Sequence, residues 1–251
     1  MGKRERLDKI LVDRGIVASR EEGRRRILAG EVLVQDRPVT KAGDLVDAGA
    51  DIRFKARSLP YASRGGTKLE GALRDFGVEI RHKIALDIGA STGGFTDCLL
   101  AFGARRVYAV DVGYGQLHWK LRTDPRVVLL ERTNIRYLRP TDLSDVPDIA
   151  TVDVSFISLR LVLPIVYRLI ASEGVALALI KPQFEVGKGK VGKGGVVRSE
   201  EERRRTVDEI SAVARDLGFM VRGVSESSLP GPKGNREFFI YLAKPVLADP
   251  S

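Results

Sequence analysis

Four charged residues occupy positions at which an amine and a carboxylate could move a proton. Lys181 follows the apolar run VALALI and precedes Pro182, and Asp153 follows the apolar run IATV. Lys68 lies in TKLEGAL, and Glu237 lies in GNREFFIYL just before another apolar run. Burial and a second cation lower the pKa of a lysine, so its amine can act as a general base. We therefore predict Lys181 as the base, Lys68 as its electrostatic partner, and Asp153 and Glu237 as the groups that orient them.

These residues lie at the ends of short apolar runs that are separated by helical segments. Runs of this length and spacing predict a mostly parallel sheet with helices on both faces, a doubly wound α/β domain. Because neighbouring parallel strands end at one edge, Asp153 and Lys181 are expected to meet there. A buried structural ion pair is the alternative for these two residues. The predicted strands are residues 84–88, 107–110, 127–130, 149–152, 175–180, 220–224 and 238–242.

A smaller unit precedes this domain. Residues 5–15 have apolar positions at helical spacing, and Ser19 with Glu22 forms a capping box that opens a helix to Gly30. Alternating apolar and polar residues then predict small strands. The composition of ARSLPYASRGG indicates a linker. We predict a small α+β domain over residues 1–57, a linker over 58–64 and the large domain over 65–251, with helices over 67–77 and about 199–217.

The small domain is rich in arginine. Three adjacent arginines lie in its second helix, and charge alone fits a solvated face as well as a binding face. The stretch from LDKILVDRG to VLVQDRPV resembles the alpha-L domain, a small RNA-binding fold. That resemblance implies that basic residues of the second helix and the following strand contact phosphates. The candidate RNA-binding residues are Arg4, Arg6, Arg20, Arg24, Arg25 and, in the SRGG stretch, Arg64.

The loop LDIGASTGGFTDCLL joins the first large-domain strand to a helix. Its glycines permit a tight turn and close approach of a ligand, but Ser91 replaces the middle glycine of the dinucleotide fingerprint. Asp111 and Asn134 end the next two strands, so a nucleotide-like ligand is indicated and NAD stays possible on these features. LDIGASTGG resembles the S-adenosylmethionine motif of class I methyltransferases. The resemblance implies that S-adenosylmethionine is the ligand. The residues that it implies as cofactor-binding are Asp87, Gly89, Ala90, Ser91, Gly93, Gly94, Phe95, Asp111, Asn134 and Asp153.

A wider resemblance joins these features. Lys68, Asp153, Lys181 and Glu237 match in order the Lys-Asp-Lys-Glu tetrad of FtsJ-like ribose 2'-O-methyltransferases. SRGGTKLEGAL, DVGYGQL, KPQFEVGKG and LPGPKGN, with the motifs above, resemble the TlyA family, also catalogued as haemolysin A. The resemblance covers nearly the whole chain. It implies a seven-stranded class I methyltransferase sheet and 2'-O-methylation of cytidine in ribosomal RNA, within the large subunit and in some members the small subunit also.

Composition limits the alternatives. The chain has 251 residues and a formal charge of +9, which favours polyanionic partners. One cysteine excludes an internal disulfide and a cysteine-cluster metal site, and the two histidines are too scattered for zinc. The charged N-terminus does not resemble a signal peptide, and residues 161–180 are too interrupted to span a membrane. We expect a cytoplasmic monomer that needs no metal and no membrane, and these features oppose a membrane-active haemolysin.

Two further interpretations concern aromatic residues and the competing binding function. Phe156 and Phe184 could flank a flipped base, although core packing is the simpler interpretation of each. Cys98 and Trp119 are predicted to be core residues. The loop VGKGKVGKGG could be a flap over RNA or a plain surface loop. An RNA-binding module without catalytic activity remains the alternative to an enzyme.

Overall fold

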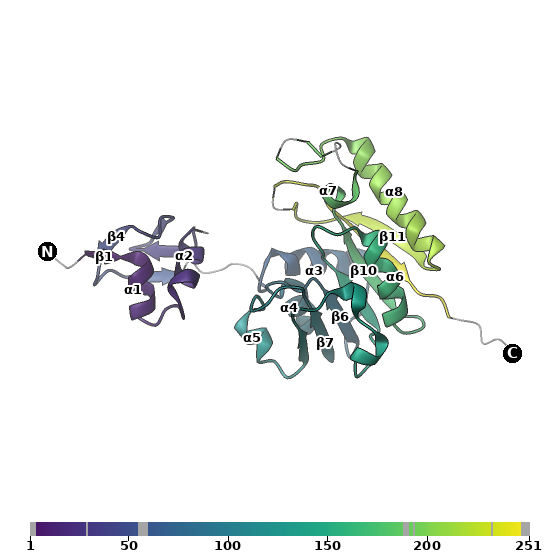
Figure 1. Cartoon of the computed structure of the whole chain (residues 1–251), viewed down its shortest axis with the longest axis horizontal. Coiled ribbons are helices and arrows are strands. Elements are labelled where there is room, and N and C mark those ends of the chain that lie inside the picture. The colour runs from purple at the N-terminus through teal and green to yellow at the C-terminus, as the bar shows by residue number, and fades with distance from the viewer. Residues whose placement is uncertain are drawn as a thin grey trace. The chain divides into compact units, whose positions relative to one another are not determined.

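A computed structural model describes residues 4–28, 30–54, 60–187, 191–192, 194–231 and 233–246 (Figure 1). The chain divides into two compact units, Met1–Ser58 and Leu59–Ser251, each described here by itself. The predicted boundary at residue 57 lies outside the described residues, and the limits of the linker stay a prediction. The flap interpretation of residues 186–195 also stays a prediction, because part of this segment lies outside the described residues.

The first unit has an α+β core. Leu7, Leu11, Ile27 and Val32 are fully buried in it. The prediction of a helix from residue 5 is wrong at its start, because residues 4–6 pair as a strand with residues 45–47 before the helix begins. The elements are β1 (Arg4–Arg6), α1 (Leu7–Asp13), α2 (Arg20–Leu28), β2 (Val32–Val34), β3 (Arg37–Val39), β4 (Leu45–Asp47) and β5 (Ile52–Phe54), with β3, β2 and β5 forming an antiparallel sheet.

The second unit is built on a seven-stranded sheet of order β11-β12-β10-β9-β6-β7-β8. All of its neighbouring strands are parallel except at β12, which runs antiparallel to both β10 and β11. The predicted doubly wound sheet is therefore confirmed, with strand bounds close to the expected ones. The strands are β6 (Ile84–Ile88), β7 (Arg106–Val110), β8 (Val127–Leu130), β9 (Ile149–Val152), β10 (Val175–Ile180), β11 (Met220–Glu226) and β12 (Phe238–Ala243).

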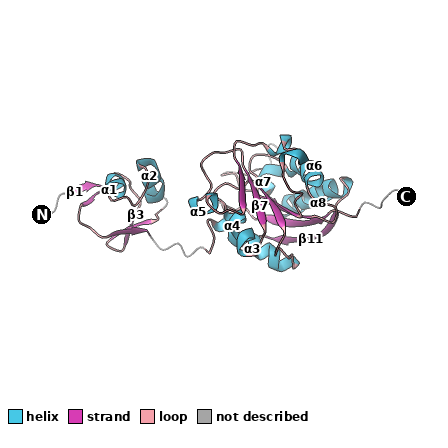
Figure 2. Ribbon diagram, turned by 90° about the horizontal axis from the view of Figure 1, so that it is seen from below, coloured by secondary structure: helices cyan, strands magenta, loops and turns pink. Residues whose placement is uncertain are grey.

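Helices cover both faces of this sheet (Figure 2). Successive strand residues point to opposite faces, so Leu86 packs with α6 and α8 while Ala85 packs with α3 and α4. The result is one apolar core on each face. The helices are α3 (Arg64–Phe76), α4 (Gly94–Ala101), α5 (Trp119–Arg122), α6 (Leu159–Leu169), α7 (Pro182–Glu185) and α8 (Glu200–Asp216), with 3-10 turns η1 (Ile135–Tyr137) and η2 (Pro140–Asp142).

Two predictions about aromatic side chains need correction. Trp119 is 73% exposed rather than buried, because α5 has a single turn and uses Leu121, with the preceding Leu117, to cover the core. Phe156 is 90% exposed, so core packing is wrong for it, and Phe184 is only half-buried. Cys98 is buried as predicted.

Candidate active site

Two ion pairs contain the four charged residues singled out from the sequence. Lys181 Nζ lies 2.5 Å from Asp153 Oδ1, and Lys68 Nζ lies 2.6 Å from Glu237 Oε2. Glu237 is buried, with Lys68 nearly so, while Lys181 and Asp153 are partly exposed. Two cations thus face two anions. The expected meeting of Asp153 with Lys181 is observed, as a short contact without the alignment of a good hydrogen bond at Oδ1.

The sheet explains why these residues are close. Asp153 and Lys181 directly follow β9 and β10, which are parallel neighbours, so both leave the sheet at one edge. Glu237 precedes β12, and because β12 is reversed its beginning lies at that same edge. Ile180 pairs with Phe238, so continuing this register by one residue places Lys181 opposite Glu237. Lys68 reaches Glu237 from the buried face of α3.

Neighbouring groups fix the two pairs further. Gln183 Nε2 donates to Glu237 Oε1 at 3.2 Å, and Lys181 Nζ donates to Ser155 Oγ at 3.1 Å. Gly231 leaves room for the Glu237 carboxylate, because a Cβ there would lie 2.2 Å from Oε1. Sequence reasoning missed Gln183 and Ser155. The only available signal was their place in KPQFEVG and VDVSF, two residues after Lys181 and Asp153.

A pocket of about 760 Å³ opens at the same edge of the sheet. That size suits a ligand as large as a nucleoside derivative, since such sites span roughly 300–1,000 Å³. The polar residues at its wall come from the ends of β6, β7, β8 and β9. Five of the predicted cofactor-binding residues line it: Gly89, Ser91, Asp111, Asn134 and Asp153.

The glycine loop is shaped by close backbone contacts. Gly89 has a φ of +85°, and a Cβ there would lie 2.4 Å from the Asp153 carbonyl oxygen, so only glycine fits between β6 and β9. Asp111 accepts hydrogen bonds from the N–H groups of Ser91 at 2.8 Å and Gly113 at 2.6 Å. These bonds hold the carboxylate of Asp111 at the pocket wall.

The other five predicted cofactor-binding residues, Asp87, Ala90, Gly93, Gly94 and Phe95, do not line the pocket. Asp87 is fully buried and accepts hydrogen bonds from Thr96 Oγ1 at 2.6 Å and Thr151 Oγ1 at 3.2 Å. Burial raises the pKa of Asp87 to about 7. Phe95 packs in the core against Phe239. Asp87 in β6 and Phe95 in α4 therefore anchor the two ends of the loop in the core.

An exposed aromatic residue marks the rim of the pocket. Phe156 lies in the wall, with a φ of +64° that side chains rarely adopt. Its ring centroid is 5.0 Å from that of Phe184, and Lys181 Nζ lies 6.0 Å from the Phe184 centroid. The two rings therefore lie beside one of the ion pairs and leave one aromatic face open to solvent.

The predicted RNA-binding arginines are exposed on their own units. Arg4 and Arg6 lie on β1, and Arg20, Arg24 and Arg25 lie on α2. Arg64 begins α3 in the second unit and donates to the Pro230 carbonyl oxygen at 3.5 Å. Their exposure is compatible with phosphate contacts, which stay a prediction.

Comparison with known proteins identifies the family. The FtsJ-like methyltransferase family matches residues 61–244, which include both ion pairs and the pocket. The chain belongs to this family. The S4 domain matches residues 5–52, the part predicted to form the alpha-L domain.

Individual relatives of this FtsJ-like methyltransferase cover nearly the whole chain. The 16S/23S rRNA (cytidine-2'-O)-methyltransferase TlyA of Mycobacterium tuberculosis is 46% identical over 96% of this chain and 91% of its own length. Hemolysin A of Brachyspira hyodysenteriae is 40% identical over 94% of this chain and 99% of its own length. A solved structure from Streptococcus thermophilus is 42% identical, with a TM-score of 0.76 over 98% of this chain and 90% of that one.

The described part of the chain lacks two kinds of feature. None of the helices there has both the length and the apolar character needed to cross a membrane. No group of three or more His, Cys, Asp or Glu side chains in the same residues is arranged to hold a metal ion.

Proposed function

We propose that this methyltransferase transfers a methyl group from S-adenosylmethionine to the ribose 2'-hydroxyl of a cytidine in ribosomal RNA. The observation that carries the proposal is the double role of Asp153, which lines the pocket and also contacts the Lys181 amine. A ligand in the pocket would therefore lie next to a candidate base.

The pocket residues fit this cofactor. Asp111 is positioned to accept hydrogen bonds from ribose hydroxyls, and Gly89 lets a ligand approach the backbone where β6 ends. Asn134 and Ser91 add polar groups to the wall. When bound, S-adenosylmethionine supplies an electrophilic methyl group on a sulfonium.

Proton removal is the task of the two ion pairs. A ribose hydroxyl is a poor nucleophile, and a neutral lysine amine can accept its proton during attack. Asp153 and Ser155 hold the Lys181 amine in place. Lys68, fixed by Glu237, adds positive charge that favours an anionic oxygen on the substrate.

The RNA substrate is supported by three observations. The relative from Mycobacterium tuberculosis carries 16S and 23S rRNA in its name, residues 5–52 match the S4 domain, and the chain has a net charge of +9. Phosphate contacts by the arginines would make binding weaken steeply with salt. Large-subunit RNA is the first substrate to test and small-subunit RNA the second. A ribosomal substrate implies that the reaction takes place in the cytoplasm. That the enzyme is a monomer stays a prediction.

The test is transfer of labelled methyl groups from S-adenosylmethionine to isolated ribosomal subunits and to naked rRNA. We expect Lys181→Ala to lower transfer by a factor of about 10² or more, because the general base is lost. Its cofactor affinity, measured by calorimetry, should stay close to that of the wild type. Lys83→Ala is the matched control, because Lys83 precedes β6 at the opposite edge of the sheet.

The outcomes separate the alternatives. An active Lys181→Ala variant would exclude Lys181 as the base. A wild-type chain that binds RNA but neither binds the cofactor nor transfers a methyl group would instead support a binding module without catalysis.

A further inference from the structure

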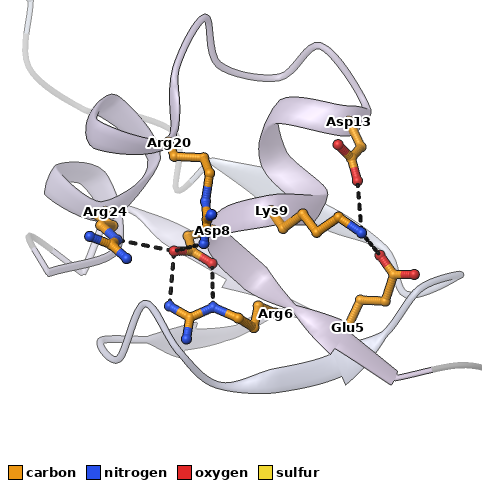
Figure 3. Close-up of polar contacts among 7 residues, drawn as sticks. All are labelled: Glu5, Arg6, Asp8, Lys9, Asp13, Arg20 and Arg24. Carbon is orange, nitrogen blue, oxygen red and sulfur yellow. Dashed lines mark hydrogen bonds and ion pairs between the residues drawn. The ribbon is translucent and has the colours of Figure 1, made fainter.

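A buried carboxylate gathers arginines in the first unit (Figure 3). The side chain of Asp8, at the start of α1, is fully buried. Around it lie Arg6 from the end of β1 and Arg20 and Arg24 from one face of α2. The side chains of these three arginines stay 44%, 53% and 55% exposed. The cluster thus combines an inaccessible anion with accessible cations.

The contacts are hydrogen bonds with definite geometry. Arg6 donates from Nε to Asp8 Oδ1 and from Nη2 to Oδ2, both at 3.0 Å. Arg20 Nη2 and Arg24 Nε each donate to Oδ2 at 3.1 Å. The two bonds from Arg6 fix its guanidinium plane, and a single bond holds each of Arg20 and Arg24 to the same carboxylate. Most of the N–H donors of the three side chains are not used by Asp8.

The charge balance argues for more than neutralisation. One arginine would pair a buried carboxylate, yet three converge here, leaving a local excess of positive charge. Like charges held this close repel each other, so the arrangement is stable only with an anion among them. A second anion on the exposed side would be bound by preordered donors without the entropy cost of ordering long side chains.

We propose that Asp8 is a positioning residue that fixes Arg6, Arg20 and Arg24 as one preformed cluster for the phosphates of an RNA backbone. The inference rests on the proposed RNA substrate. It adds that the unit recognises the spacing of phosphates as well as their charge. Asp8 itself lies behind the arginines and does not touch the RNA.

The decisive variant is Asp8→Asn in the full chain, because it nearly preserves shape and raises the net positive charge. If Asp8 acts by positioning, KM for the ribosomal subunit should rise about tenfold, with kcat at saturating RNA within about twofold of the wild type. Retention on heparin, a polyanion without the RNA geometry, should be unchanged or stronger. Asp13→Asn on the same helix is the control, since Asp13 is exposed and its contact with Lys9 is long, at 3.9 Å.

A second variant keeps the test decisive if Asp8→Asn fails to fold. Arg24→Lys keeps the charge of an exposed side chain but loses the planar fork, so it should also raise KM about tenfold while preserving the salt dependence of binding. In the double variant, Asp8→Asn with Arg24→Lys, the loss of binding free energy should be smaller than the sum of the two single losses, because both residues act through one cluster.

The results also distinguish this inference from the proposed function. Wild-type affinity in both Asp8→Asn and Arg24→Lys, or tighter subunit binding by Asp8→Asn, would overturn the positioning role. Absence of methyl transfer by the wild-type chain would overturn the proposed function instead. Subunit binding measured directly by filter retention would still test the role of Asp8.

Discussion

At the scale of single residues, Asp87 connects the ligand loop to the pH dependence of stability. Burial raises the pKa of Asp87 to about 7, although hydrogen bonds from Thr96 and Thr151 oppose that rise. An aspartate in an unfolded chain titrates near pH ~4. Between these values the folded state binds more protons than the unfolded state, so the free energy of unfolding decreases as the pH rises. Asp87 is therefore destabilising in its charged form.

The variant Asp87→Asn should remove this dependence. Relative to the variant, the wild type should lose roughly 2 kcal/mol of unfolding free energy between about pH 5.5 and about pH 8. Urea denaturation of both proteins at several pH values measures the difference. Parallel stability curves for the two proteins would show that Asp87 does not titrate in this range.

Prediction from the sequence was strongest where a charged residue directly follows a recognisable strand. Asp153 and Lys181 could be placed together because each follows an apolar run and parallel neighbours end at one edge. The partners of Arg20 and Arg24 could not be foreseen, because Asp8 is 12 and 16 positions away and is reached only after α1 packs on α2. A run of charged residues can be recognised in the sequence, but the residue that pairs with it is determined by the tertiary structure.

At the scale of elements, the direction of β12 was the feature that the pattern could not predict. The apolar residues of FFIYLA indicate a strand, but such a pattern is the same in either direction. Because β12 is reversed, Glu237, which precedes its strand, lies at the same edge as Asp153 and Lys181, which follow their strands. Glu237 was predicted at the site without knowledge of this direction, and the register of β10 with β12 now gives the physical reason.

The packing of α3 against α4 leads to a prediction at this scale. A Cβ on Gly94 would lie 2.2 Å from Ser63 Oγ and 2.9 Å from the backbone nitrogen of Gly66, so the starts of the two helices touch at this glycine. We expect Gly94→Ala to push α3 outward, displacing Lys68 and lowering both the melting temperature and methyl transfer. Calorimetric melting and the transfer assay check this. Unchanged melting would mean that the helices separate without cost.

At the scale of the whole molecule, the two units have separate apolar cores. Leu7, Leu11 and Ile27 pack only within the first core, while the sheet of the second unit is covered on both faces. Domains with separate cores can unfold separately. The S4 match lies within the first unit, whereas the pocket and the two ion pairs of the candidate active site belong to the second.

We therefore expect two transitions in scanning calorimetry of the full chain. The smaller unit should melt first, because small cores bury less surface. S-adenosylmethionine at about 100 times its Kd should stabilise only the second transition, by roughly 2.7 kcal/mol. One cooperative transition that shifts as a whole would show instead that the units unfold together.

The ion pair between Lys68 and Glu237 also bears on how the enzyme is made. Its partners are 169 positions apart, whereas the residues lining the pocket all lie between Ile88 and Leu161. Contacts of such long sequence separation form late, and synthesis proceeds from the N-terminus. A ribosome-bound nascent chain would carry every pocket residue long before residue 237 emerges. The ion pair can therefore form only after the chain has been synthesised to at least residue 237, when every residue of the pocket is already present.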